Sequence, residues 1–145
     1  MNAPVRIRAF ERSLPMALMR ARESVMARFR PILAEHDLTE QQWRVLRALD
    51  AADGPLSVGD LAAQTYLLGP SLARMLASME QRELLERRTG ADARRAEITI
   101  SDEGRRVVGQ VSPESEAAYE QVERRLEPGE LDELHRLLDK IGGFE

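Results

Sequence analysis

The segment from Arg87 to Gly104 constrains the fold of this chain more than any other part of the sequence. Turn-forming Gly90 and Asp92 separate two short stretches, residues 84–88 and 96–100, that suit β-strands. The second stretch alternates polar and apolar residues, which indicates a strand with one buried face. We therefore predict a β-hairpin. Four arginines lie at its tip: Arg87, Arg88, Arg94 and Arg95.

Two short helices joined by a tight turn precede the predicted hairpin. Ser57, followed three residues later by Asp60, resembles a capping box at the start of the first helix. Residues 67–71 form the turn, and Pro70 suits the first turn of a second helix over residues 70–82. A helix pair followed by a basic hairpin is typical of small proteins that grip a DNA groove and the phosphates beside it.

The exposed side of the second helix and the hairpin tip are the predicted DNA contacts. Ser71 and Arg74 lie opposite the apolar residues of their helix, where a hydroxyl and a guanidinium suit contact with base edges. Asp92 is placed to hold the loop by an ion pair, so that Arg94 or Arg95 reaches a narrow minor groove. Ordinary solvated surface is the alternative for both features. The full predicted set is Ser57, Gly69, Pro70, Ser71, Arg74, Arg88, Asp92, Arg94 and Arg95.

The charge of the chain favours the same surface. The net charge is −4, but residues 69–95 hold six arginines and four acidic residues, a local charge of +2. Residues 112–145 hold four basic and ten acidic residues, a local charge of −6. Local potential, not total charge, decides where a polyanion docks. Double-stranded DNA is therefore the expected partner.

Composition excludes several other classes of protein. The 145 residues are 43% hydrophobic and 32% charged, as in a single soluble domain. The chain has no cysteine and only two histidines, His36 and His135, so we expect no disulfide, no metal site and no cofactor. Nothing resembles a nucleophile–base pair or a phosphate-binding loop, so we expect no enzyme. No apolar run suits a membrane span or a signal peptide, so the expected location is the cytoplasm.

Longer helices are predicted on both sides of the helix pair and hairpin. Residues 7–35 carry one apolar stripe, with Pro15 as a start or a kink and Pro31 bending or restarting the last turn. After the hairpin, a helix capped by Ser101 is kinked or restarted at Pro113. The first and last helices are too apolar on one face to stay exposed. We therefore expect a two-fold homodimer on a pseudo-palindromic operator.

Local signals mark two further helix ends. Thr39, with Gln42 three residues later, forms a second capping box. Pro128 and Gly129 end the preceding helix, and a leucine-rich final helix follows.

The order of these elements, together with two motifs, resembles the MarR family of winged helix–turn–helix regulators over essentially the whole chain. One motif is the wing Asp92-Ala93-Arg94. The other runs from Ile100 to Gly104, where Ile100 and Ser101 replace the family's usual leucine and threonine. The resemblance implies a mainly α fold with a small β-hairpin and with N- and C-terminal dimerisation helices.

The resemblance also implies a division of the chain. Residues 1–145 form a single MarR-type domain, with a DNA-binding lobe at residues 38–100. The dimerisation helices occupy residues 1–37 and 101–145.

Within the family, residues 12–23 and 38–47 resemble the repressors of homoprotocatechuate degradation operons. This subgroup implies a homodimeric repressor of an aromatic catabolic operon that a small aromatic carboxylate releases from DNA. Two alternatives remain: a regulator of efflux or stress genes, and a winged helix that binds protein instead of DNA.

The effector would bind between the dimerisation helices and the DNA-binding lobe. Arg20 lies on a polar strip of the first helix and can pair with a ligand carboxylate through two hydrogen bonds. Trp43 and Arg47, one turn apart, offer a ring wall and a second cation. The alternative is Trp43 in the core and the arginines in interface ion pairs. The predicted ligand contacts are Ser13, Met16, Ala17, Arg20, Trp43 and Arg47.

Overall fold

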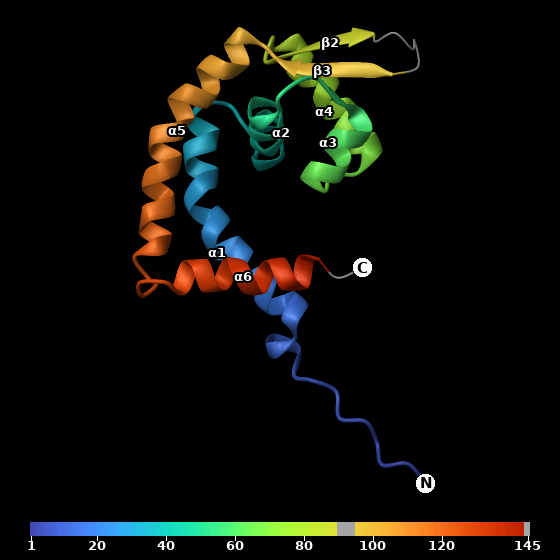
Figure 1. Cartoon of the computed structure of the whole chain (residues 1–145), viewed down its shortest axis with the longest axis vertical. Helices are drawn as coiled ribbons and strands as arrows, with labels where there is room; N and C mark the ends of the chain where they lie inside the picture. Colours follow the sequence, from blue (N-terminus) through green and yellow to red (C-terminus); the bar gives the residue numbers. More distant parts are fainter. Residues whose placement is uncertain (90–94, 144–145) are drawn as a thin grey trace.

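The chain folds into a helical arm and a compact lobe, which together outline an open C (Figure 1). The computed structural model describes residues 1–89 and 95–143. The lobe contains α2 to β3, and the arm contains α1, α5 and α6 (Figure 1). The elements are η1 (Phe10–Arg12), α1 (Leu14–Glu35), α2 (Glu40–Ala51), β1 (Leu56–Ser57), α3 (Val58–Thr65), α4 (Gly69–Gln81), β2 (Leu85–Thr89), β3 (Ala96–Ile100), α5 (Asp102–Glu123) and α6 (Glu130–Gly142).

The first long helix begins beside Pro15, which the sequence predicts as a start or a kink. α1 begins at Leu14, after the single 3₁₀ turn η1, so the start is confirmed, whereas the apolar stripe from residue 7 extends beyond the helix. Pro15 occupies the first turn of α1, where its missing N–H costs no hydrogen bond. Pro31 lies inside α1, which continues without a restart to Glu35.

The predicted capping residues begin their helices. Thr39 accepts a hydrogen bond from the N–H of Gln42, whose side chain accepts one from the N–H of Thr39, at 3.1 and 3.0 Å. Ser57 and Asp60 make the same reciprocal pair at the start of α3. The Ser101 hydroxyl accepts from the N–H of Gly104 at 2.9 Å. These confirmed caps satisfy N–H groups that a helix start leaves unpaired.

The predicted hairpin is part of a three-stranded antiparallel sheet with strand order β1-β3-β2. β2 runs one residue later than predicted, from Leu85 to Thr89, because Leu84 completes the turn that follows α4. β1 was not predicted from the sequence, and its two residues pair with β3 at Leu56↔Ile98 and Ser57↔Glu97. This pairing joins the start of α3 to the base of the hairpin.

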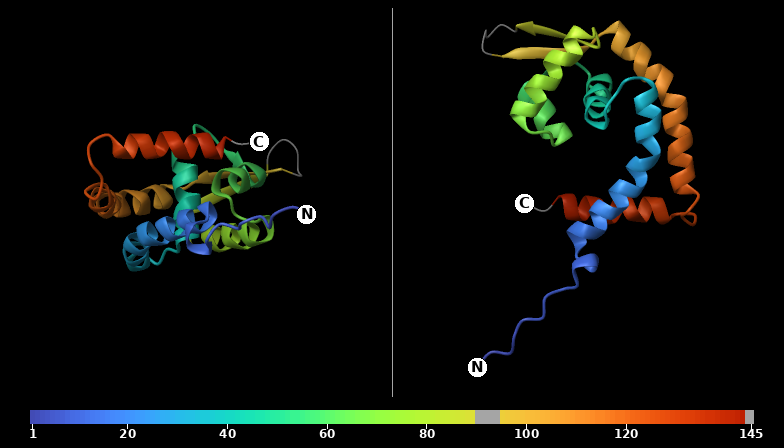
Figure 2. Two further views of the ribbon diagram at one scale, coloured as in Figure 1. Left: turned by 90° about the horizontal axis from the view of Figure 1, so that it is seen from below. Right: turned by 180° about the vertical axis from the view of Figure 1, so that it is seen from behind.

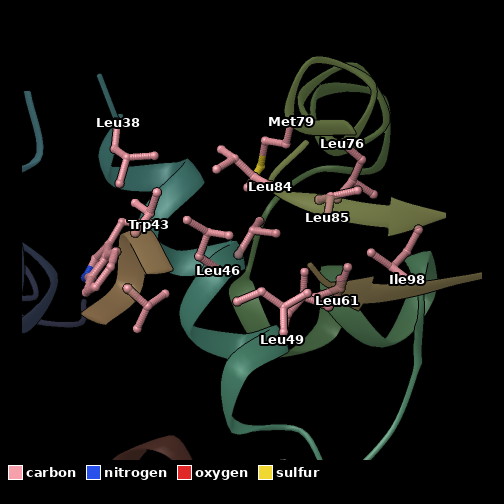
Figure 3. Packing of buried hydrophobic residues seen from close by; sticks show 14 of the residues in the cluster. Leu38, Trp43, Leu46, Leu49, Leu61, Leu76, Met79, Leu84, Leu85 and Ile98 are labelled. Carbon is pink, nitrogen blue, oxygen red and sulfur yellow. The ribbon is translucent and has the colours of Figure 1, made fainter. Parts of the chain in front are cut away.

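The core of the lobe lies between α2, α3, α4 and the sheet (Figure 3). Leucines from each helix meet Leu85 and Ile98 from the strands, and Trp43 lies at the edge of the cluster (Figure 3). The predicted apolar side of α4 is confirmed by the buried residues Leu72, Leu76 and Met79. This burial turns the opposite side of α4 outward.

The arm consists of α1 packed along α5, with α6 turned across its far end (Figure 1). α5 is one continuous helix with Pro113 inside it and a visible bend (Figure 1), so of the two predicted alternatives the structure has the kink and not the restart. α6 and α1 overlap in Figure 1, but the view from below separates them (Figure 2). No residue of α6 is buried. Among the helices of residues 1–89 and 95–143, none is apolar and long enough to cross a bilayer.

Candidate nucleic-acid interface and aromatic pocket

The exposed side of α4 presents the predicted base-contacting residues. Ser71 and Arg74 are both exposed, one turn apart, on the side opposite Leu72 and Leu76. Gly69 and Pro70 form the exposed first turn of the helix. The four residues therefore share one accessible end of α4, from which a side chain can enter a groove.

The register of the hairpin separates the two arginines of β2. Arg87 lies opposite Ile98, and Arg88 lies opposite Glu97. Arg88 also has a guanidinium nitrogen 3.9 Å from a carboxylate oxygen of Glu86, so two acidic residues flank it. The structure therefore places Arg88 on an acidic face of the sheet and Arg87 on the opposite face.

Arg87 faces a hollow at the base of the hairpin, which we call the wing-base hollow. It encloses about 460 Å³ between α3 and the sheet. Its walls are formed by Ser57, Val58, Gly59, Arg87, Arg95 and Ala96. The predicted residues Ser57 and Arg95 are thus brought together, and Arg87, which the prediction omitted, joins them.

Two arginines line the wing-base hollow, and the charge of Arg95 acts on Asp60 at the start of α3. Hydrogen bonds from the backbone and side chain of Ser57 lower the pKa of Asp60, and the charge of Arg95 lowers it further. Asp60 is committed to the capping box, so Arg87 and Arg95 remain as the cations that face the hollow. A phosphate fits such a surface by charge and by hydrogen bonding.

Two predicted DNA contacts, Asp92 and Arg94, lie outside the described residues, as does the ion pair predicted between them.

A second hollow, which we call the aromatic pocket, lies between α1, α2 and α5. It encloses about 230 Å³, less than the roughly 300 Å³ at which sites for drug-sized ligands begin. The ring centroids of Phe29 and Tyr119 lie 4.7 Å apart, with an angle of 60° between the ring planes. Trp43 contributes a third ring to the pocket wall. The lining residues are Arg22, Val25, Met26, Phe29, Glu40, Trp43, Arg44, Arg47 and Tyr119.

Glu40 organises the charges at the aromatic pocket. Its side chain is only 9% exposed, and one carboxylate oxygen contacts both Arg22 and Arg44, the latter at 3.1 Å. Its other oxygen accepts from Arg30 at 3.2 Å. The pocket walls thus carry three arginines, Arg22, Arg44 and Arg47, against the single carboxylate of Glu40. This excess of positive charge suits an anionic ligand.

The predicted ligand contacts divide into two groups. Trp43 and Arg47 line the aromatic pocket, and Trp43 is at the same time a core residue, 8% exposed. The residues Ser13, Met16, Ala17 and Arg20 do not line it.

The early residues of α1 have other partners. The Ser13 hydroxyl donates to the carbonyl of Phe10 at 2.9 Å, and Arg20 donates to the carbonyl of Glu11 at 3.1 Å. The described chain therefore does not bring Arg20 to Trp43, because the pocket lies further along α1, beginning at Arg22.

Sequence reasoning missed most of the pocket walls. The spacing of Glu40 and Arg44, four residues apart at the start of α2, is one signal for an ion pair. Tyr119 and Phe29 carry no such signal, because they meet only when α5 packs on α1. Across residues 1–89 and 95–143, no group of three histidine or acidic side chains is arranged to hold a metal ion.

Comparison with known proteins identifies the family. Residues 36–96 match the model of the MarR family. The chain is 38% identical over 131 residues to the homoprotocatechuate degradative operon repressor of Escherichia coli, covering 89% of this chain and 87% of that protein.

Two solved structures share the whole fold. NadR in complex with 4-hydroxyphenylacetate is 32% identical, with a TM-score of 0.82 over 97% of this chain and 100% of that one. The transcriptional repressor CouR bound to a 23-mer DNA duplex is 25% identical, with a TM-score of 0.82 over 95% and 99%. The relatives are transcriptional regulators and not enzymes. By its fold, its motifs and these identities, the chain belongs to the MarR family of DNA-binding transcriptional regulators.

Proposed function

We propose that the chain is a homodimeric repressor of an aromatic catabolic operon and that a small aromatic carboxylate releases it from DNA. The aromatic pocket carries this proposal, because three rings surround a space whose charged groups are three arginines and one carboxylate. A ligand with one ring and one carboxylate complements both features. The name of the Escherichia coli repressor and the ligand of NadR support a hydroxyphenyl acid as the effector.

The proposed DNA-binding lobe comprises residues 38–100. Ser71 and Arg74 would read base edges from the exposed end of α4, which also presents Gly69 and Pro70. Arg87 and Arg95 would contact phosphates, and the DNA duplex bound by CouR supports this role for the lobe.

The proposed dimerisation part comprises residues 1–37 and 101–145. Its strongest support is α6, whose apolar side chains are exposed in a single chain. A two-fold dimer would carry two copies of α4 to successive major grooves of a pseudo-palindromic operator.

The proposed mechanism is a shift in population. The aromatic pocket lies between the arm helices α1 and α5 and the lobe helix α2, so a ligand there contacts both parts. It releases DNA only to the extent that it prefers the arrangement in which the two copies of α4 no longer match the grooves.

Two arginines are candidate anchors for the ligand carboxylate, Arg47 and Arg20, and the other proposed contacts line the ring. Trp43 and Arg47 line the aromatic pocket in the single chain. We retain Ser13, Met16, Ala17 and Arg20, on the first two turns of α1, as proposed contacts in the homodimer.

The test compares Arg47→Ala and Arg20→Ala in release of DNA by 4-hydroxyphenylacetate. The DNA is a duplex from the region upstream of the chain's own gene, and fluorescence anisotropy reports binding. We expect the concentration for half-release to rise roughly tenfold in the variant that loses the anchor, since a hydrogen bond to a charged group contributes about 1.5 kcal/mol or more. If neither variant changes that concentration, neither arginine anchors the carboxylate. Absence of release from the wild-type protein would refute this effector class.

A further inference from the structure

Arg44 joins the aromatic pocket to the turn that precedes α4. One terminal nitrogen of its guanidinium donates to the Glu40 carboxylate at 3.1 Å, within the pocket wall. The other donates to the main-chain carbonyl of Thr65 at 2.8 Å, 21 positions along the chain. A single planar group therefore spans the distance from the pocket to the end of α3.

The Thr65 carbonyl belongs to a peptide that directs the chain into α4. Thr65 is the last residue of α3, and Tyr66 follows in the left-handed conformation, with φ 58° and ψ 31°. The N–H of the same peptide donates to the carbonyl of Ala62 at 2.9 Å. α4 begins three residues later, at Gly69. Both polar groups of this peptide are thus held, and Arg44 holds one of them.

The left-handed conformation of Tyr66 depends on restraints such as the hydrogen bond from Arg44 to the Thr65 carbonyl. A left-handed residue other than glycine costs about 1 kcal/mol or more and persists only where its surroundings hold it. The carbonyls of the last helical turn have no partner within the helix, so an external donor such as Arg44 is needed at Thr65. The Tyr66 ring cannot supply the restraint, because this residue is 90% exposed.

At the other end of the bridge, Arg44 shares a carboxylate oxygen with a second cation. Arg22 and Arg44 both contact the same oxygen of Glu40. An anionic ligand in the aromatic pocket would compete with Glu40 for these guanidinium groups. A guanidinium has a fixed fork geometry, so a change of acceptor at one terminal nitrogen reorients the other.

We propose that Arg44 is the positioning residue that couples the aromatic pocket to the recognition helix α4. An aromatic carboxylate draws the Arg44 guanidinium from the Thr65 carbonyl, and the peptide at 65–66 loses the restraint that sets the entry to α4. The switching role rests on the proposed effector, whereas the restraint on the turn exists without it.

The first experiment uses no effector and measures amide hydrogen exchange at Tyr66, Leu67 and Leu68. Arg44→Lys keeps the charge, but a compact ammonium lacks the fork that reaches both acceptors. We expect exchange in this turn to accelerate about tenfold, the effect of losing a charged hydrogen bond of about 1.5 kcal/mol. The matched control is Arg47→Lys, which alters the other α2 arginine of the same pocket and should leave exchange in the turn within about twofold of wild type.

The second experiment measures coupling with 4-hydroxyphenylacetate as the probe. Quenching of Trp43, the only tryptophan, reports binding of the probe, and anisotropy reports affinity for the upstream duplex. The DNA affinities are compared without the probe and at a probe concentration that saturates each variant, so that weaker probe binding does not enter the ratio. We expect the ratio for Arg44→Lys to fall to less than about half the wild-type ratio. Arg47→Lys should weaken probe binding and keep the wild-type ratio at saturation. A merely structural role would lower DNA affinity equally with and without the probe.

The outcomes separate this inference from the proposed function. Wild-type exchange in the turn of Arg44→Lys overturns the inference, as does a coupling ratio equal to that of wild type. If the wild-type protein does not bind the probe, the proposed effector class fails. The exchange measurement then still decides whether Arg44 holds the turn.

Discussion

Gly104 occupies a position on α5 where a side chain has no room. A Cβ at this position would lie 2.2 Å from the carbonyl oxygen of Leu84 and 2.7 Å from a side-chain carbon of Ile100. The Leu84 carbonyl oxygen also accepts a hydrogen bond from the N–H of Ser101 at 3.2 Å. This hydrogen bond restrains the backbone at Leu84, so the backbone cannot move aside freely. This contact explains why the segment from Ile100 to Gly104 ends in glycine.

We predict that Gly104→Ala destabilises the fold by about 3 kcal/mol, since the added methyl group forces the backbone apart. Gly109→Ala is the matched control in the same helix, because nothing lies within 4 Å of its Cβ position. Helix propensity should make this second change stabilising by up to about 1 kcal/mol. Urea unfolding monitored by circular dichroism measures both changes. Equal stability of the two variants would contradict the steric argument.

Asp60 links the stability of α3 to pH. The Ser57 N–H and hydroxyl bind its carboxylate, and Arg95 adds a favourable charge, so its pKa in the folded state lies below the usual range. A group whose folded pKa is lowered stabilises the fold above its unfolded pKa and loses that contribution as the pH falls through the folded pKa.

In the Asp60→Asn variant, the free energy of unfolding should therefore depend less on pH in the acidic range than in the wild-type protein. We expect the variant to be less stable than wild type near pH 7 and the difference to shrink below about pH 4, the ordinary pKa of an aspartate in an unfolded chain. Thermal unfolding across this range measures the effect. Asp53→Asn, in the exposed loop before the same helix, is the control. A difference that stays constant from pH 7 to pH 3 would exclude the linkage.

At the scale of elements, the pairing of β2 with β3 determines which face of the sheet each hairpin arginine occupies, and therefore which of them is placed to contact DNA. Arg87 and Arg88 are adjacent in sequence and identical in chemistry, but the register with β3 places them on opposite faces of the sheet. Glu86 and Glu97 flank Arg88, whereas Arg87 faces the wing-base hollow with Arg95. Arg87 thus has the better position for a phosphate contact, and Arg88 stays a DNA contact predicted from the sequence.

We predict that Arg87→Ala weakens binding to the upstream duplex and flattens its salt dependence, because each phosphate contact adds about 0.9 to the slope of log K against log salt. Arg88→Ala is the control and should change the slope by less than half as much, since acidic neighbours already screen its charge. Arg94→Ala, predicted from the sequence, belongs in the same series. Titrations at three salt concentrations measure all slopes, and a larger effect at Arg88 would reverse the assignment.

At the scale of the whole molecule, α6 is an element without a partner in its own chain. Leu134, Leu137, Leu138 and Ile141 are 36–45% exposed, Leu131 is half-buried, and no residue of the helix is buried. Apolar surface that a single chain leaves open in this way marks an interface. Together with the open C outline in Figure 1, this supports a second copy as the element that covers α6.

We predict that Leu134→Glu combined with Leu138→Glu converts a dimer to a monomer and lowers affinity for the upstream duplex. One lobe then reads one half-site, and the energetic advantage of binding both half-sites at once is lost. Light scattering after gel filtration measures the mass. Asp132→Ala, on the polar side of the same helix, is the control and should remain dimeric. A variant that stays dimeric would place the interface elsewhere.

The sequence by itself determined where α2, α3 and α5 begin, because capping signals act within a few residues. Thr39, Ser57 and Ser101 each cap a helix through a partner three positions away. The resemblance to the family came from the same short-range motifs. By contrast, apolar periodicity left the start of the first helix open between residue 7 and Pro15, because it says little about where a helix begins, and the structure places the start at Leu14.

Only the tertiary structure decided which side chains from distant parts of the sequence lie next to one another. It brought Arg22, Arg44 and Arg47 together at the aromatic pocket and placed Arg87 and Arg88 on opposite faces of the sheet. It also joined Arg44 to the end of α3, 21 residues away. These features depend on the packing of α1 against α5 and of β3 against β2, and the positions of distant side chains follow from packing instead of from local hydrogen bonding.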